Sequence, residues 1–150
     1  MTDHDYLSIQ RLQAAYADVV TRRAWAELEP LFEPDAPITL ALADRDPMNF
    51  SGPHEIGEFI AASIERFEFF QFVILNTVLD IDGSDATGRM YMTELRQDRE
   101  GHWSQIFGLY VDRYRLAGDN WRFAQRRYHS LARPTADLAV FAIPSNIDSP

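Results

Sequence analysis

The fold is decided by residues 72–131, which read FVILNTVLDIDGSDATGRMYMTELRQDREGHWSQIFGLYVDRYRLAGDNWRFAQRRYHSL. Four segments, at residues 72–82, 86–98, 102–116 and 121–131, are rich in Val, Ile, Tyr, Phe and Thr and are joined by short polar turns. Runs of this kind bounded by Gly, Asp and Asn predict successive hairpins. We therefore expect a four-stranded antiparallel meander in the C-terminal half.

The N-terminal half carries helical periodicity instead. Apolar side chains recur at helical spacing over about residues 5–21 and again from Trp25, where Pro30 predicts a short, irregular helix. A strand is expected at residues 38–43, and a third helix at residues 53–67 with Pro53 at its first position. Helices followed by a meander predict an α+β fold in which the helices cover one face of a bent sheet and enclose a pocket.

Length and composition limit the class of protein. The 150 residues predict one domain over residues 1–133 and an irregular tail over residues 134–150. A net charge of −9 argues against nucleic acid or an anionic membrane as a partner. The chain has no cysteine, and all 14 basic residues are Arg, which excludes thiolate and Schiff-base lysine chemistry. With no membrane-length apolar run and no signal-like segment after Met1, we expect a cytoplasmic protein.

The meander is apolar on both strand faces, since Phe72 and Ile74 alternate with Val73 and Leu75. A sheet covered by helices on one side is normally polar on the other. The second face therefore needs a cover, which is either the C-terminal tail or a second subunit. We expect a homodimer formed through this face.

The chain resembles the SnoaL-like branch of the NTF2-like superfamily, which has a cone fold, in the order and spacing of short segments along most of its length. Those segments are residues 16–25 (YADVVTRRAW), 31–36 (LFEPDA), 52–56 (GPHEI), 76, 80–86 (DIDGSDA), 110–112 (YVD), 118–123 (GDNWRF) and 126–127 (RR).

The resemblance implies a small-molecule pocket with acid/base chemistry that needs no cofactor. The family includes polyketide cyclases, dehydratases, a dehydrochlorinase and isomerases, together with many proteins that have a pocket but no known role. Many active relatives pair an Asp near the end of the first helix with a His on the first meander strand. In this chain those positions fall at Thr21 and Phe72, and neither side chain exchanges a proton at neutral pH. Nearby Asp18 falls on the opposite side of its helix from the apolar residues and is expected on the surface.

Other polar residues are candidates for the missing chemistry. Arg127 and His129 share strand parity with Phe123, so we expect both to face the core. Arg127 is expected to hold an anionic or carbonyl oxygen while His129, or the inward-facing Tyr16, exchanges a proton. The alternative is a structural bridge from the arginine to Glu94 or Asp112. The residues expected to line the pocket and bind substrate are Trp25, Phe50, Phe59, Asn76, Met90, Met92, Glu94 and Tyr110.

No metal site is expected, because His4, His54, His102 and His129 show no paired ligand spacing. A glycine-rich phosphate loop and a Gly-x-Ser-x-Gly elbow are also absent, which argues against nucleotide binding and serine hydrolysis. Two functions remain open: a cyclase, dehydratase or isomerase acting on an apolar cyclic carbonyl or hydroxy compound, and a non-catalytic binding protein for such a molecule.

Overall fold

A computed structural model of the chain describes residues 2–42, 45–133 and 139–147. Helix α1 (Asp3–Arg22) begins after Thr2, whose Oγ1 accepts a hydrogen bond of 3.1 Å from the Asp5 backbone N–H. Such a cap satisfies one of the free amide groups of the first turn. The predicted irregular helix is a 3-10 helix, η1 (Trp25–Leu31), with Pro30 inside it. None of the helices in the described residues is long and apolar enough to cross a membrane.

The predicted third helix is α2 (Gly52–Ile64), with Pro53 in its first turn. The meander consists of β3 (Phe67–Asp82), β4 (Asp85–Asp98), β5 (Trp103–Ala117) and β6 (Asn120–Arg133), each joined to the next by a short turn.

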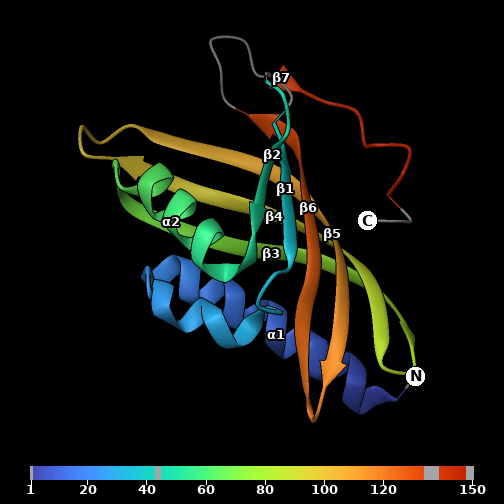
Figure 1. Cartoon of the computed structure of the whole chain (residues 1–150). Helices are drawn as coiled ribbons and strands as arrows, with labels where there is room; N and C mark the ends of the chain where they lie inside the picture. The colour runs from blue at the N-terminus through green and yellow to red at the C-terminus, as the bar shows by residue number, and fades with distance from the viewer. Residues whose placement is uncertain (1, 43–44, 134–138, 148–150) are drawn as a thin grey trace.

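Further short strands extend the sheet. Strand β1 (Pro37–Ala41) pairs in parallel with β6 and antiparallel with β2 (Met48–Ser51), a strand that the sequence did not predict. The order is β2-β1-β6-β5-β4-β3, so the sheet is mixed and open, and the predicted α+β cone fold is confirmed (Figure 1). Residue 43 of the predicted strand lies outside the described residues.

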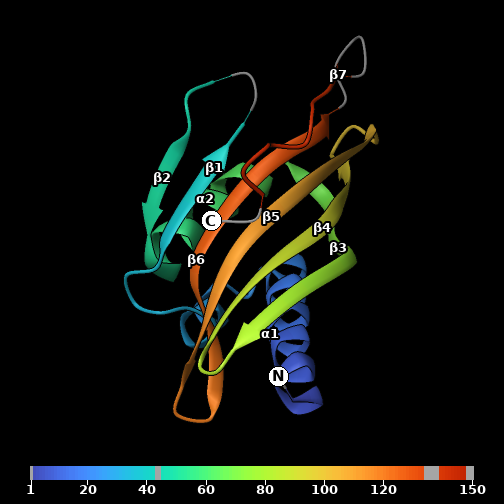
Figure 2. The ribbon, with the colours of Figure 1, turned by 90° about the vertical axis from the view of Figure 1, so that its right-hand side faces the viewer.

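The helices cover one face of the strongly curved sheet (Figures 1 and 2). The core lies between them, where Ile9, Tyr16, Phe32 and Phe123 are at most 2% exposed. The other face carries exposed apolar side chains, including Leu75 and Val78.

The C-terminal tail runs beside the sheet's outer face. Strand β7 (Ala139–Val140) pairs with the end of β6, and the Phe141 backbone N–H donates a 2.9 Å hydrogen bond to the Leu131 carbonyl. Figure 2 shows the tail crossing in front of β5 and β6. Residues 134–138 and 148–150 of the predicted tail lie outside the described residues. The tail therefore covers part of the face for which we expected a second subunit, and the homodimer stays a prediction.

Candidate functional site

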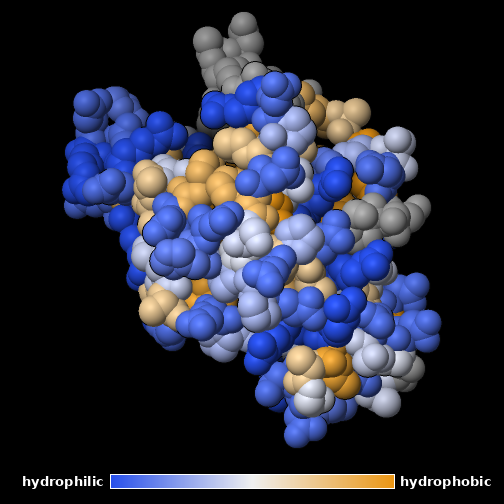
Figure 3. All heavy atoms as spheres, in the orientation of Figure 1, coloured by the Kyte–Doolittle hydropathy of each residue, from blue (hydrophilic) through white to orange (hydrophobic). Residues whose placement is uncertain are grey.

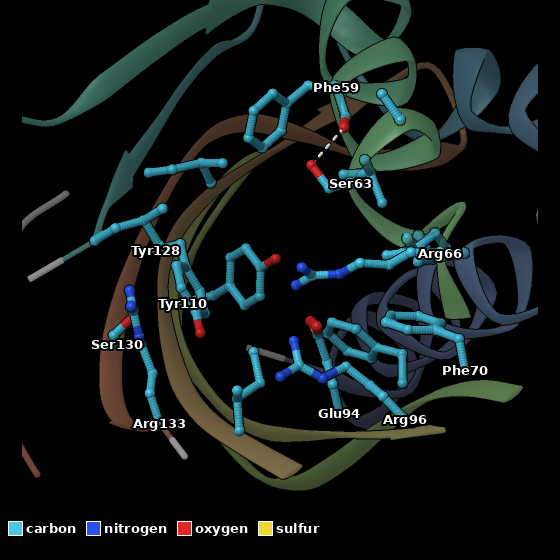
Figure 4. A pocket seen from close by; sticks show the side chains of 18 of the residues that line it. Phe59, Ser63, Arg66, Phe70, Glu94, Arg96, Tyr110, Tyr128, Ser130 and Arg133 are labelled. Atoms are coloured by element: carbon cyan, nitrogen blue, oxygen red, sulfur yellow. Dashed lines mark hydrogen bonds between the residues drawn. The ribbon is translucent and has the colours of Figure 1, made fainter. Parts of the chain in front are cut away.

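A cavity of about 600 Å³ lies between the helices and the concave face of the sheet. Side chains from α1, α2 and strands β1, β3, β4, β5 and β6 form its wall (Figure 4). Most of the wall is apolar. The aliphatic and phenylalanine side chains are Val20, Leu40, Leu42, Phe59, Ile60, Ile64, Phe70, Phe72 and Ile106.

Glu94 is the carboxylic acid on the cavity wall. Inward-facing positions alternate along β4, so Glu94 follows the buried Met90 and Met92 on the same face. Protein surrounds most of its side chain, and this desolvation raises the pKa of Glu94 to about 7, although the nearby Arg96 opposes the shift. The carboxyl group is therefore divided between its acid and its conjugate base at neutral pH.

Three tyrosines surround the same space. The ring centroids of Tyr16 and Tyr110 are 6.2 Å apart, and those of Tyr110 and Tyr128 are 5.1 Å apart. Burial raises the pKa of all three hydroxyls above the ordinary value of tyrosine, so each stays protonated at neutral pH and able to donate a hydrogen bond. Within the described residues the buried Tyr128 hydroxyl has no hydrogen-bond partner.

A buried ion pair supports this aromatic wall from behind. Arg126 Nε and Nη2 donate to the two carboxylate oxygens of Asp112 at 2.8 and 3.1 Å. The guanidinium carbon lies 4.4 Å from the ring centroid of Tyr16 and 3.8 Å from that of Tyr110. Tyr114 extends the pair into a network, donating to Asp112 Oδ2 at 2.9 Å. The pair therefore fixes the positions of two cavity tyrosines.

The structural bridge that we considered for Arg127 is made by its neighbour Arg126. The expectation that Arg127 and His129 face the core is wrong, because β6 contains a β-bulge. Phe123 pairs with Tyr114 and Gln125 pairs with Arg113, which leaves Ala124 as an extra residue. An extra residue moves every later side chain to the opposite face. Arg126, Tyr128 and Ser130 consequently face inward and are at most 6% exposed.

The side chains of His129 and Arg127 leave β6 on the face opposite the cavity, and neither residue is among those that line it. Partial burial, together with the charge of Arg127, lowers the pKa of His129, so its imidazole is neutral at pH 7. The structure does not bring these two side chains together with Tyr16, the third predicted catalytic residue. Their catalytic roles remain untested predictions.

Four predicted site residues do line the cavity: Tyr16, Phe59, Glu94 and Tyr110. Five others do not. Trp25, Met90 and Met92 pack in or against the core, and the Phe50 ring stacks 4.8 Å from Phe59, behind the wall. Asn76 is exposed, because Leu75 is an extra residue in β3 and places Asn76 opposite Tyr91 on the outer face.

The positions implied by the family dyad do meet in space. Thr21 Oγ1 accepts a 3.0 Å hydrogen bond from the Phe72 backbone N–H, and the Phe72 side chain lines the cavity. The fold therefore agrees with matching Thr21 and Phe72 to the two positions of the family's dyad. In this chain the two residues join α1 to β3, and neither side chain is an acid or a base. Asp18 lies on the surface as expected, paired with Arg22 at 2.9 Å.

Sequence reasoning missed further polar residues that line the cavity, which are Arg45, Ser63, Arg66, Arg96, Tyr128, Ser130 and Arg133. The sequence pattern does indicate one of these residues. Arg96 is two residues beyond Glu94 on the same strand and therefore shares its face. The others come from separate elements, and only the tertiary structure brings them together.

A cluster of potential metal ligands, which the sequence did not predict, lies outside the set of residues that line the cavity. The turn between β4 and β5 places ligand atoms of Asp98, Glu100 and His102 within 4.8 Å of one another. Asp98 Oδ1 accepts backbone hydrogen bonds of 2.9 Å from both Glu100 and His102, which explains the cluster as the capping of an exposed turn.

Comparisons with known proteins agree with the fold. A family model described as a SnoaL-like domain matches residues 2–127. The Kfla4162 protein of Kribbella flavida superposes with a TM-score of 0.78 at 18% identity, over 89% of this chain and 95% of that one. A hexachlorocyclohexane dehydrochlorinase, LinA-type3 of Novosphingobium barchaimii LL02, superposes with a TM-score of 0.73 at 18% identity, over 94% and 96% of the two chains. The search of curated proteins found no match.

Proposed function

Because the chain belongs to the SnoaL-like domain family, we propose that it is a small-molecule enzyme that performs acid/base chemistry without a cofactor. The observation that carries the proposal is Glu94, a carboxyl group on the wall of the cavity between the helices and the sheet, with a pKa raised to about 7. A proton-transfer group is most effective when its pKa lies near the working pH. Perturbed pKa values of this kind gather at functional sites.

The proposed reaction is proton removal from an apolar cyclic carbonyl or hydroxy compound, as in a dehydration, cyclisation or isomerisation. Glu94 in its ionised form takes the proton from the carbon next to the carbonyl. The hydroxyls of Tyr110 and Tyr128 are neutral and donate hydrogen bonds to the oxygen on which negative charge develops. Glu94 then returns the proton to the product or to the leaving hydroxyl, so it is regenerated in each cycle.

The second candidate function is binding without chemistry, and the hydrogen bond between Thr21 and Phe72 favours it. That contact occupies the place where the resemblance puts an Asp–His pair, so the usual acid and base are absent. A binding protein would keep the apolar walls and the tyrosines and would hold its ligand without turnover.

The experiment that separates the two functions is Glu94→Gln, an isosteric change that removes the titrating group. Wild type and variant are assayed on a panel of cyclic ketones and hydroxylated aromatics, after ligands released from the purified protein have been identified by mass spectrometry. Turnover should fall 100-fold or more, about 2.7 kcal/mol of barrier, while ligand affinity changes little.

The matched control is Glu68→Gln, because Glu68 is an exposed carboxylate on the neighbouring strand β3. It should leave turnover unchanged. Wild-type protein that retains a ligand tightly but turns over no member of the panel would support the binding function instead.

A further inference from the structure

Arginine side chains outnumber carboxylates among the described residues of the cavity wall, in contrast to the whole chain. The chain has a net charge of −9, yet the charged side chains that the described residues place on this wall are four arginines and one carboxylic acid. The arginines come from separate parts of the fold: Arg45 follows β1, Arg66 lies between α2 and β3, Arg96 belongs to β4 and Arg133 ends β6. A cleft lined mainly by one sign of charge attracts ligands of the opposite charge.

Arg66 and Arg96 are neighbours on the cavity wall. In Figure 4 both point into the cavity, toward the same space as the Glu94 carboxyl group and the Tyr110 hydroxyl. Both guanidinium carbons also lie 4.8 Å from the ring centroid of Phe67, which supports them on the apolar side. Arg96 Nε donates to Ser104 Oγ at 3.1 Å.

Neither of these two guanidinium groups is neutralised by a salt bridge within the described residues. Arg22, Arg115 and Arg126 each form at least one salt bridge to a carboxylate, with distances of 2.8–3.3 Å. Arg66 and Arg96 form none. Burial lowers the pKa of Arg96, the charge of nearby Glu94 opposes this shift, and the charge of Arg66 adds to it. Two cations beside a cavity that share one partly ionised carboxyl group are stabilised by a bound anion.

We infer that the cavity takes a ligand whose apolar body carries one carboxylate, and that Arg66 and Arg96 bind this carboxylate beside Glu94. The inference deepens the proposed function, on which it rests, because it names the class of substrate for the same site. A planar guanidinium matches a carboxylate with two parallel hydrogen bonds. The aliphatic and aromatic wall formed by Phe59, Ile60 and their neighbours receives the rest of the molecule.

The molecular surface fits a ligand that has an apolar body and one charged group. Figure 3 shows a patch of hydrophobic residues above α2 that is flanked by hydrophilic ones. An apolar ring system with a single acidic group satisfies both parts of such a site. A neutral polycyclic compound would leave the two guanidinium groups without an anion.

The test compares two probes of the same size and shape, 2-naphthoate and the uncharged 2-naphthamide, by isothermal titration calorimetry at about pH 7.5. The wild-type protein should bind 2-naphthoate at least about tenfold more tightly, as expected for charge-assisted hydrogen bonds. Arg66→Met and Arg96→Met should each reduce this preference to threefold or less. Arg113→Met is the control, because Arg113 is exposed on β5 and is not among the cavity-lining residues.

Arg66 is exposed, so its replacement keeps the test valid even if Arg96→Met fails to fold. Equal binding of the two probes, no binding of 2-naphthoate, or a preference that persists in both arginine variants would each overturn the inference. Tighter binding of 2-naphthyl phosphate than of 2-naphthoate would overturn the assignment of a carboxylate.

Glu94→Gln separates this inference from the proposed function. The variant should keep its preference for 2-naphthoate, because Arg66 and Arg96 remain. A preference that depends on the arginines, in a protein without turnover, would support the inference and refute the enzyme. Loss of turnover in Glu94→Gln without any preference for the anion would do the reverse.

Discussion

Glu94 on β4 and Phe72 on β3 are register partners across an antiparallel pair of strands, and both side chains line the cavity. Directly opposed side chains on one sheet face lie within contact distance. The resemblance places the family's histidine at Phe72. The proposed acid/base group of this chain therefore lies one strand away from that position and faces the same space.

The pH dependence of turnover tests the role of Glu94 as a base. A base acts in its ionised form, so kcat/KM should rise as the pH increases through about 7 and then level off. The tyrosines close enough to Glu94 for their charges to interact are Tyr16, Tyr110 and Tyr128, and burial keeps the pKa of each above its ordinary value, so none of them ionises in this range. Arg66 and Arg96 also point toward Glu94. A profile measured between about pH 5 and 9 that shows no inflection near 7 would contradict the role.

The ionisation of Glu94, which should raise kcat/KM, should lower the stability of the fold. The folded pKa of Glu94, about 7, lies above its ordinary value of 4.5, so the folded state binds the proton more tightly than the unfolded state. Glu94 is neutral in both states below about pH 4.5, and its ionisation destabilises the fold progressively as the pH rises toward 7. Glu94→Gln should therefore be more stable than wild type at pH 8 by about 3 kcal/mol, and this difference should vanish below about pH 4.5.

Urea unfolding at the two pH values measures this effect. Glu68→Gln serves as the control and should show no pH-dependent difference from wild type. An equal effect of Glu94→Gln at both pH values would mean that the carboxyl group is not titrating in this range.

The buried pair of Arg126 and Asp112 should be costly to break. Arg126→Met leaves the Asp112 carboxylate buried without its partner, and we expect a loss of about 3–5 kcal/mol in the free energy of unfolding. The double variant with Asp112→Leu should lose much less than the sum of the single changes. Arg22→Met removes the exposed pairs with Asp18 and Glu27 and should cost far less, because exposed ion pairs add little to stability. Equal losses at the buried and exposed arginines would contradict this ranking.

Gly108 makes room for Tyr128. A Cβ atom at Gly108 would collide with the Tyr128 ring, which lines the cavity from the neighbouring strand. Gly108→Ala should therefore cost about 1–3 kcal/mol of stability and weaken ligand binding, because the ring must shift. In a Tyr128→Ala background the same change should cost little. Thermal unfolding of the four proteins gives the coupling, and additive effects would show that the ring is not the obstacle.

The homodimer is the prediction with the simplest measurement. The outer face of the sheet exposes Leu75, Val78 and Phe107, and the described part of the tail runs beside β6. Light scattering at micromolar concentration should give twice the chain mass of 17.3 kDa. A mass of 17.3 kDa would show that the tail is a sufficient cover for that face.

The sequence by itself determined the fold. Helical spacing up to Val20, the proline at position 30 and the Gly- and Asp-rich turns of residues 82–120 are local signals, and each produced the element that it predicted. Local signals suffice there because hydrogen bonding and side-chain periodicity act within a few residues of the chain. The short strand β2 was missed, since four residues carry too little periodicity to be recognised.

Only the tertiary structure decided which side chains form the site. The extra residues Leu75 and Ala124 each move the following side chains to the other face of the sheet, so Arg126 lies inside where parity indicated Arg127. Parity along a strand is informative only between bulges, and a bulge is set by pairing with the neighbouring strand. Arg66 meets Arg96 for the same kind of reason: sheet curvature and helix packing bring distant residues together, and no local pattern in the chain encodes that distance.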